Sequence, residues 1–93
     1  MVSGPASVPA WADFATALGH NLRRARAARN LTQEELVELA GISLYSYQQY
    51  ERGAATRGGA PTNPRLATIL AICQALDVEI GDVLPGQPRL TTT

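Results

Sequence analysis

The chain has 93 residues with eight arginines, no lysine and eight acidic residues, so its formal net charge is zero. Hydrophobic residues make up 45% of it, which provides for one small folded domain and argues against disorder of the whole chain. A single cysteine excludes a disulfide framework, and one cysteine with one histidine cannot build a structural zinc site.

Targeting and catalytic signals are missing from the sequence. No apolar run approaches the roughly 18 residues that cross a bilayer, and the first nine residues carry no basic residue, so we expect no signal peptide. His20 and Cys73 are far apart and have no acidic motif around them. We therefore expect a small, soluble, cytoplasmic domain that is not an enzyme, has no metal or cofactor and does not bind membranes.

The charges are sorted along the chain. Residues 23–33 carry four arginines, residues 34–51 carry four glutamates, and residues 52–65 carry three further arginines. A neutral molecule can therefore have one basic face and one acidic face. Ordinary solvated helix surfaces give the same pattern, so charge alone leaves both interpretations open.

The N-terminal third contains one long predicted helix. Residues 1–9 are predicted to be a flexible tail, and residues 10–30 are rich in Ala, Leu and Arg without proline, which is typical of a helix. Phe14, Leu18 and Leu22 recur at a spacing of four and predict one buried stripe. Trp11 and Phe14 either cap the core or form a dimer contact.

Two shorter helices joined by a tight turn are predicted next. Thr32 and Glu35 have the spacing of a capping box, which starts a helix at residue 33, and Gly41 ends it. Ser43 then caps a third helix that runs to residue 52 and is closed by Gly53. Two helices joined by such a glycine-containing turn indicate a helix-turn-helix unit.

The remainder predicts a loop and two more helices. Residues 54–62 have no periodicity, whereas Asn63 and Pro64 suit the cap and first residue of a fourth helix over 64–76. This helix is apolar nearly all round, so we expect it to be buried centrally. A short helix over 80–84 and a flexible tail over 85–93 complete an all-α fold of five helices, with one domain over residues 10–84.

The third helix divides into two stripes. Ser46, Tyr47 and Tyr50 form one, and the other consists of Leu44, Tyr45, Gln48 and Gln49. Exposed glutamines suit the major groove of DNA, because Gln pairs bidentately with adenine. Leu44 and Tyr45 suit thymine methyl groups, and Tyr45 alternatively suits a phosphate. A stripe that faces solvent or a protein partner is the competing interpretation.

Several stretches, in order, resemble the lambda-repressor-like (Cro/Xre-type) helix-turn-helix domain. They are Leu18-Gly-His-Asn-Leu-Arg-Arg-Ala-Arg, Leu31-Thr-Gln-Glu-Glu-Leu, Ala40-Gly-Ile-Ser, Tyr50-Glu-Arg-Gly, and the later segment 64–78 with Asp82-Val-Leu. The resemblance covers roughly residues 18–84. It implies a five-helix lambda-repressor-like domain that binds double-stranded DNA as a sequence-specific transcriptional regulator. One departure is the ten residues between Gly53 and Pro64, several more than most members of the family have.

The resemblance also assigns roles to individual residues. Base reading falls to Leu44, Tyr45, Gln48 and Gln49, and contacts to the DNA backbone to Gln33, Ser43, Arg23, Arg57 and Arg65. Arg26 and Glu51 are expected to form a partly buried structural salt bridge. A homodimer would place two recognition helices about 34 Å apart on a near-palindromic operator.

A protein-interaction module on the same fold is the alternative function. The antitoxin of a toxin–antitoxin pair is one example, and such proteins often bind DNA as well. Residues 85–93 are short and nearly featureless, so they offer little to wrap a toxin. The sequence leaves open, in either case, a further protein partner that it does not identify.

Overall fold

The computed structural model of the chain describes residues 4–92. A short 3-10 helix η1 (Pro5–Ser7) precedes five α-helices: α1 (Pro9–Ala28), α2 (Gln33–Ala40), α3 (Leu44–Arg52), α4 (Leu66–Leu76) and α5 (Ile80–Val83). Over this part of the chain there is no β-strand, only an isolated bridge between Ala54 and Pro61. The predicted all-α class with five helices is confirmed.

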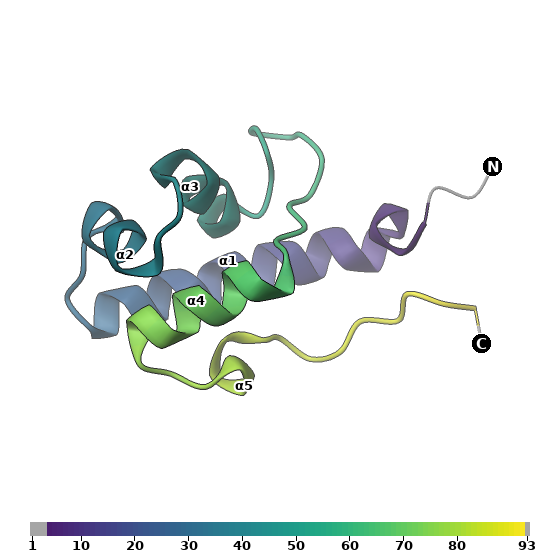
Figure 1. The fold of residues 1–93 in the computed structure, drawn as a ribbon. Helices are drawn as coiled ribbons and strands as arrows, with labels where there is room; N and C mark the ends of the chain where they lie inside the picture. Colours follow the sequence, from purple (N-terminus) through teal and green to yellow (C-terminus); the bar gives the residue numbers. More distant parts are fainter. Residues whose placement is uncertain (1–3, 93) are drawn as a thin grey trace.

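The long helix α1 is the axis of the molecule (Figure 1). Helix α3 contacts α1, α2 contacts α4, and α5 contacts both α1 and α4, so that α2 and α3 lie on one side in this view and α5 on the other. The amide of Asn21 on α1 donates to the carbonyl oxygen of Val83 over 2.8 Å, which ties the last helix to the first. None of the described helices combines the length and apolarity that a membrane span needs.

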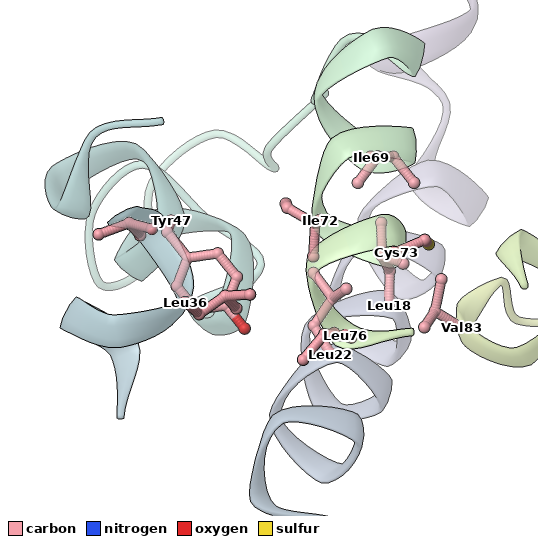
Figure 2. Packing of buried hydrophobic residues seen from close by; sticks show 10 residues of the cluster. Leu18, Leu22, Leu36, Tyr47, Ile69, Ile72, Cys73, Leu76 and Val83 are labelled. Atoms are coloured by element: carbon pink, nitrogen blue, oxygen red, sulfur yellow. The ribbon is translucent and has the colours of Figure 1, made fainter. Parts of the chain in front are cut away.

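Every α-helix contributes to one core (Figure 2). Its buried side chains include those labelled in the figure: Leu18 and Leu22 of α1, Leu36 of α2, Tyr47 of α3, Ile69, Ile72, Cys73 and Leu76 of α4, and Val83 of α5. Burial raises the pKa of the Cys73 thiol, and the thiol packs as a small apolar group. On α1, Leu18 and Leu22 of the predicted stripe are buried, Phe14 is partly buried against the core, and the small residues Ala15 and Gly19 are buried beside them.

Helix α4, which we predicted to be centrally buried, contributes four buried residues to the core but is not buried on every side. Leu66 is 66% exposed and Leu70 is 40% exposed, so one side of the helix faces outward with leucines on it. The sequence pattern misled because the core and the neighbouring helices α2 and α5 cover only the remaining faces of α4. These two leucines, one turn apart, form a small exposed apolar patch on this side of α4.

The predicted start of α4 is also wrong. The helix begins at Leu66, with Arg65 in extended conformation as its N-cap residue and no side-chain cap, two residues later than Pro64. Thr62 explains the delay, because its N–H donates to the carbonyl oxygen of Gly53 and its own carbonyl accepts from the indole of Trp11. These two bonds hold the segment extended before the helix can begin.

The remaining helix ends differ only slightly from the prediction. Helix α1 ends at Ala28, because Asn30 takes a left-handed conformation with a φ of 56°. Within residues 1–9, predicted as a tail, Pro5–Ser7 form η1. The Trp11 and Phe14 rings stack with centroids 5.1 Å apart, and Phe14 packs against the core, which supports the predicted core role.

Helices α1 and α3 approach each other through glycine. A Cβ atom built on Gly19 would lie 2.6 Å from the carbonyl oxygen of Tyr50 and closer still to that of Glu51. Gly53, in a left-handed conformation with a φ of 81°, lies against the backbone of Thr16 on the same helix. The crossing therefore depends on the absence of side chains at these two positions, and it sets where α3 lies.

Replacing Gly19 with alanine tests this crossing. Alanine favours a helix by about 0.5–1 kcal/mol over glycine, but the new methyl group overlaps backbone atoms that cannot rotate away. We expect Gly19→Ala to lower the free energy of unfolding by about 1–3 kcal/mol, measured by urea denaturation followed by circular dichroism.

Gly81→Ala is the matched control. Gly81 lies in α5, and a Cβ atom built on it would meet no other atom within 4 Å. Its substitution should therefore leave the urea midpoint unchanged or raise it. Equal effects of the two substitutions would show that the α1–α3 crossing is not as close as described.

Candidate nucleic-acid interface

Local sequence signals set the geometry of α2 and α3. The Thr32 hydroxyl accepts from the backbone N–H of Glu35, and the Glu35 carboxylate accepts from the N–H of Thr32, so the predicted capping box is present. Gly41 ends α2 in a left-handed conformation with a φ of 73°, which glycine adopts without strain. The hydroxyl of Ser43 then caps α3 by accepting from the N–H of Ser46.

The carboxylate of Glu51 is the buried centre of this region. Its side chain is 1% exposed and receives two bonds from Arg26, Nε to Oε2 over 2.6 Å and Nη2 to Oε1 over 3.1 Å. Arg26 also donates from Nη1 to the carbonyl oxygen of Leu31, 3.0 Å away, between α1 and α2. The pair expected from the family resemblance therefore links the end of α3 to α1 and to the entry of α2.

The charge state of Glu51 follows from its partners. Burial acts to raise its pKa, but the hydrogen bonds from Arg26 and Gln33 outweigh burial and hold the pKa below its usual value of 4.5. The contribution of the pair to stability is fully present above that usual value and is lost only as the pH falls through the lower folded-state pKa. Glu51 is thus an ionised carboxylate, which accepts hydrogen bonds and cannot donate them.

Two side chains of the predicted DNA-binding set also reach Glu51. Arg23, 58% exposed, places Nε 3.5 Å from Oε1, and Gln33 donates from Nε2 to the same oxygen over 3.1 Å. Gln33 in turn accepts at Oε1 from Nε2 of Gln48 over 3.2 Å. The structure therefore brings Arg23, Gln33 and Gln48 together from three different helices.

Tyr47 fills the space beside this cluster. Its ring is fully buried, and burial together with the nearby Glu51 carboxylate raises the pKa of its hydroxyl. The hydroxyl makes no hydrogen bond with the described residues. Tyr47 is therefore the part of the core that lies beside the Glu51 cluster, and it is a neutral phenol.

The four residues of the outward stripe are not equivalent. Tyr45 is 69% exposed, and Gln48 is also exposed, whereas Gln49 is half-buried. Leu44 is half-buried and packs against the core, so part of its side chain is not available to a ligand. The protruding part of the stripe is thus formed by Tyr45 and Gln48, with Gln49 beside them.

The long connection from α3 to α4 is folded into a hairpin (Figure 1). The N–H of Ala55 donates to the carbonyl oxygen of Ala60 over 3.0 Å, and the N–H of Gly59 donates to that of Thr56 over 2.8 Å. Arg57 lies in the resulting four-residue turn, followed by Gly58 with a φ of 74°. The loop therefore presents Arg57 at its tip.

Helix α3 holds this hairpin through two side chains. Gln49 donates from Nε2 to the carbonyl oxygen of Ala55 over 3.2 Å. Arg52 donates to the carbonyl oxygens of Ala54, 3.1 Å away, and Ala55, 2.8 Å away. No sequence signal points to this role for Arg52, because the pairing depends on the hairpin and not on helical spacing.

The remaining predicted contacts lie at helix starts. Gln33 and Ser43 are at the beginnings of α2 and α3, and Arg65, exposed, is the N-cap residue of α4. N–H groups in the first turn of a helix have no partner within the helix and attract anions. No set of three or more potential metal ligands comes together among residues 4–92.

The comparisons with known proteins agree with this geometry. A family profile described as a helix-turn-helix domain matches residues 17–84. The chain is also similar to a solved structure, the high-resolution crystal structure of the restriction-modification controller protein C.AhdI from Aeromonas hydrophila. That match has 30% sequence identity and a TM-score of 0.65, and it covers 75% of this chain and 96% of that chain. No curated protein sequence matches the chain.

Replacing Arg26 with methionine tests the buried pair. The substitution keeps much of the apolar stem but leaves the Glu51 carboxylate buried without its cation. Breaking a buried pair in this way costs about 3–5 kcal/mol. We expect Arg26→Met to lose that much of the free energy of unfolding at neutral pH, measured by urea denaturation.

Arg24→Met on the same helix is the control. Arg24 is exposed and its bond goes to Asn21 one turn earlier, so a change below about 0.5 kcal/mol is expected there. A small effect at both positions would contradict the central role assigned to the Arg26–Glu51 pair.

Proposed function

The chain belongs to the helix-turn-helix domain family, and from this premise we propose that it is a sequence-specific transcriptional regulator that binds double-stranded DNA as a homodimer. The similarity to a restriction-modification controller protein supports the regulatory role. The observation that carries the proposal is the outward stripe of α3, where Tyr45 and Gln48 protrude from a helix braced by the buried Arg26–Glu51 pair. A rigid helix with exposed amides suits the major groove.

Phosphate contacts would supply most of the affinity in this proposal. We assign them to the side chains and helix-start amides of Gln33, Ser43, Arg23, Arg57 and Arg65. Arg23, Arg57 and Arg65 are exposed, and they come from α1, from the hairpin and from the start of α4. If these three arginines face the same DNA, a chain with zero net charge still presents a basic face to it.

A dimer surface is provided by the outward side of α4. Leu66 and Leu70 lie one turn apart on this side and are exposed in the single chain. A two-fold symmetric dimer buries the same patch on both copies, so each leucine contributes two buried side chains to the interface. We propose that these leucines meet their counterparts and thereby fix the separation of the two α3 helices.

The second candidate is a protein-interaction module such as an antitoxin. The exposed leucines of α4 favour this candidate as well. A partner protein would cover Leu66 and Leu70 as well as a second copy would. The two candidates differ in what the purified chain does alone, because only the homodimer needs no other protein.

Selection from a random duplex library tests the proposed function. The purified protein is mixed with duplexes that carry a randomised central segment at near-physiological salt, and the retained DNA is sequenced. A two-fold symmetric motif is the expected result. An unenriched pool would contradict sequence-specific binding and favour the interaction module.

Two substitutions separate base reading from backbone binding. Gln49→Ala should relax the base preference at one position of each half-site, because its amide contacts a base edge. Arg65→Ala should weaken binding to all sequences alike and reduce the salt dependence by about one phosphate contact. Competition binding of the selected duplex and of single-base variants measures both effects. Uniform loss of affinity in both variants would contradict this division of roles.

Leu66→Glu tests the dimer surface. Two buried charges replace two apolar contacts in a symmetric interface, so we expect the dimer dissociation constant to rise about a hundredfold, measured by light scattering over a dilution series. Leu39→Glu on α2 is the matched control, because Leu39 is 64% exposed and lies outside the proposed dimer surface. Equal dissociation in both variants, or none, would place the dimer contact elsewhere.

A further inference from the structure

A chain of three side chains connects the buried carboxylate to the outward stripe. Oε1 of Glu51 accepts from Nε2 of Gln33, and Oε1 of Gln33 accepts from Nε2 of Gln48. The first member is buried and the last is exposed, so the chain leads from the core to the surface. In both bonds the amide nitrogen of the residue nearer the surface donates to an oxygen of the residue nearer the core.

This direction follows from the charge of Glu51. An ionised carboxylate only accepts, so Gln33 must turn its amide nitrogen toward it. The oxygen of Gln33 then faces Gln48, which must also turn its nitrogen inward. Reversing either amide would bring two acceptor oxygens together beside a buried negative charge. The orientation of an exposed amide, normally free to flip, is thereby set by a residue that is not at the surface.

Gln49 has the same orientation for a different reason. Its Nε2 donates to the carbonyl oxygen of Ala55 in the hairpin, and a backbone carbonyl also only accepts. Among the described residues, these bonds leave the carbonyl oxygen and one N–H of Gln48 and of Gln49 without a partner. Both amides therefore turn one N–H inward. Gln48 is held by Gln33 and the buried Glu51, and Gln49 is held by the backbone of the hairpin.

We propose that Glu51 and Gln33 act as positioning residues that orient Gln48 to read adenine. An amide that offers one oxygen and one N–H matches adenine, which presents the N6 amino group and the N7 acceptor in the major groove. Where adenine presents its amino group, guanine presents O6 and thymine presents O4. On either of these bases the Gln48 oxygen would therefore face another oxygen. This specificity rests on the proposed function of the chain in DNA binding.

The relay itself is tested in the free protein. We use Gln33→Met, which keeps the length of the side chain but removes both bonding groups, and Gln33→Ala as a second variant if the first does not fold. Solvent exchange of the Gln48 side-chain amide protons is measured by NMR, with the exposed Gln74 of α4 as internal reference. Exchange should be slower at Gln48 than at Gln74 in the wild type, and equal in the variant. Equal rates in the wild type would overturn the relay.

The reading role is tested with the random duplex library. Comparison of the wild type with Gln48→Ala and with Gln49→Ala identifies the position that each glutamine reads. At the base pair that Gln48 reads, we expect an adenine preference of about tenfold or more in the wild type and a reduced preference in Gln33→Met. The preference at the base pair that Gln49 reads should stay unchanged. Adding Gln48→Ala to Gln33→Met should cause no further loss of preference.

The outcomes separate the relay from the general function. Enrichment by the wild type with an unchanged Gln48 position in Gln33→Met would overturn the positioning role while the proposed function stands. An equal loss of affinity of Gln33→Met for all sequences would also overturn the positioning role, because it would show that Gln33 contacts only a phosphate. No enrichment by the wild type would overturn the proposed function, and the reading role with it, whatever the exchange rates of the free protein are.

Discussion

The structure depends on one buried negative charge. The Glu51 carboxylate at the end of α3 is 1% exposed and is stabilised by Arg26 of α1, which also bonds to the entry of α2. Because the charge cannot reach water, α1, α2 and α3 must keep the positions that supply its partners. The close approach of α1 and α3 at Gly19 also restricts the backbone, so both the buried charge and this backbone contact fix the position of α3.

The same charge organises polar groups nearer the surface. Arg23 and Gln33 reach Glu51 from two different helices, and Gln48 joins them through Gln33. Residues that the sequence assigns separately to backbone contact, base contact and structure thus form one cluster. A contact made by one of them with a ligand therefore changes the surroundings of the others.

Much of the fold could be predicted from the sequence because its signals are local. Capping residues such as Thr32 and Ser43 and the terminating Gly41 act within one turn, and the structure has each helix end that they indicate. The late start of α4 and its exposed Leu66 could not be predicted, because they depend on Trp11 and on which neighbours reach the helix. The Gln33–Gln48 bond was equally invisible, since it joins two helices across a turn.

The hairpin between α3 and α4 is closed at its base. The N–H of Thr62 bonds to the carbonyl of Gly53, and the indole of Trp11 secures the same residue from α1. Residues beyond this closure can therefore be added or removed at the tip without a change in the register of α4. In evolutionary terms, the length of the tip and the placement of α3 can therefore vary independently.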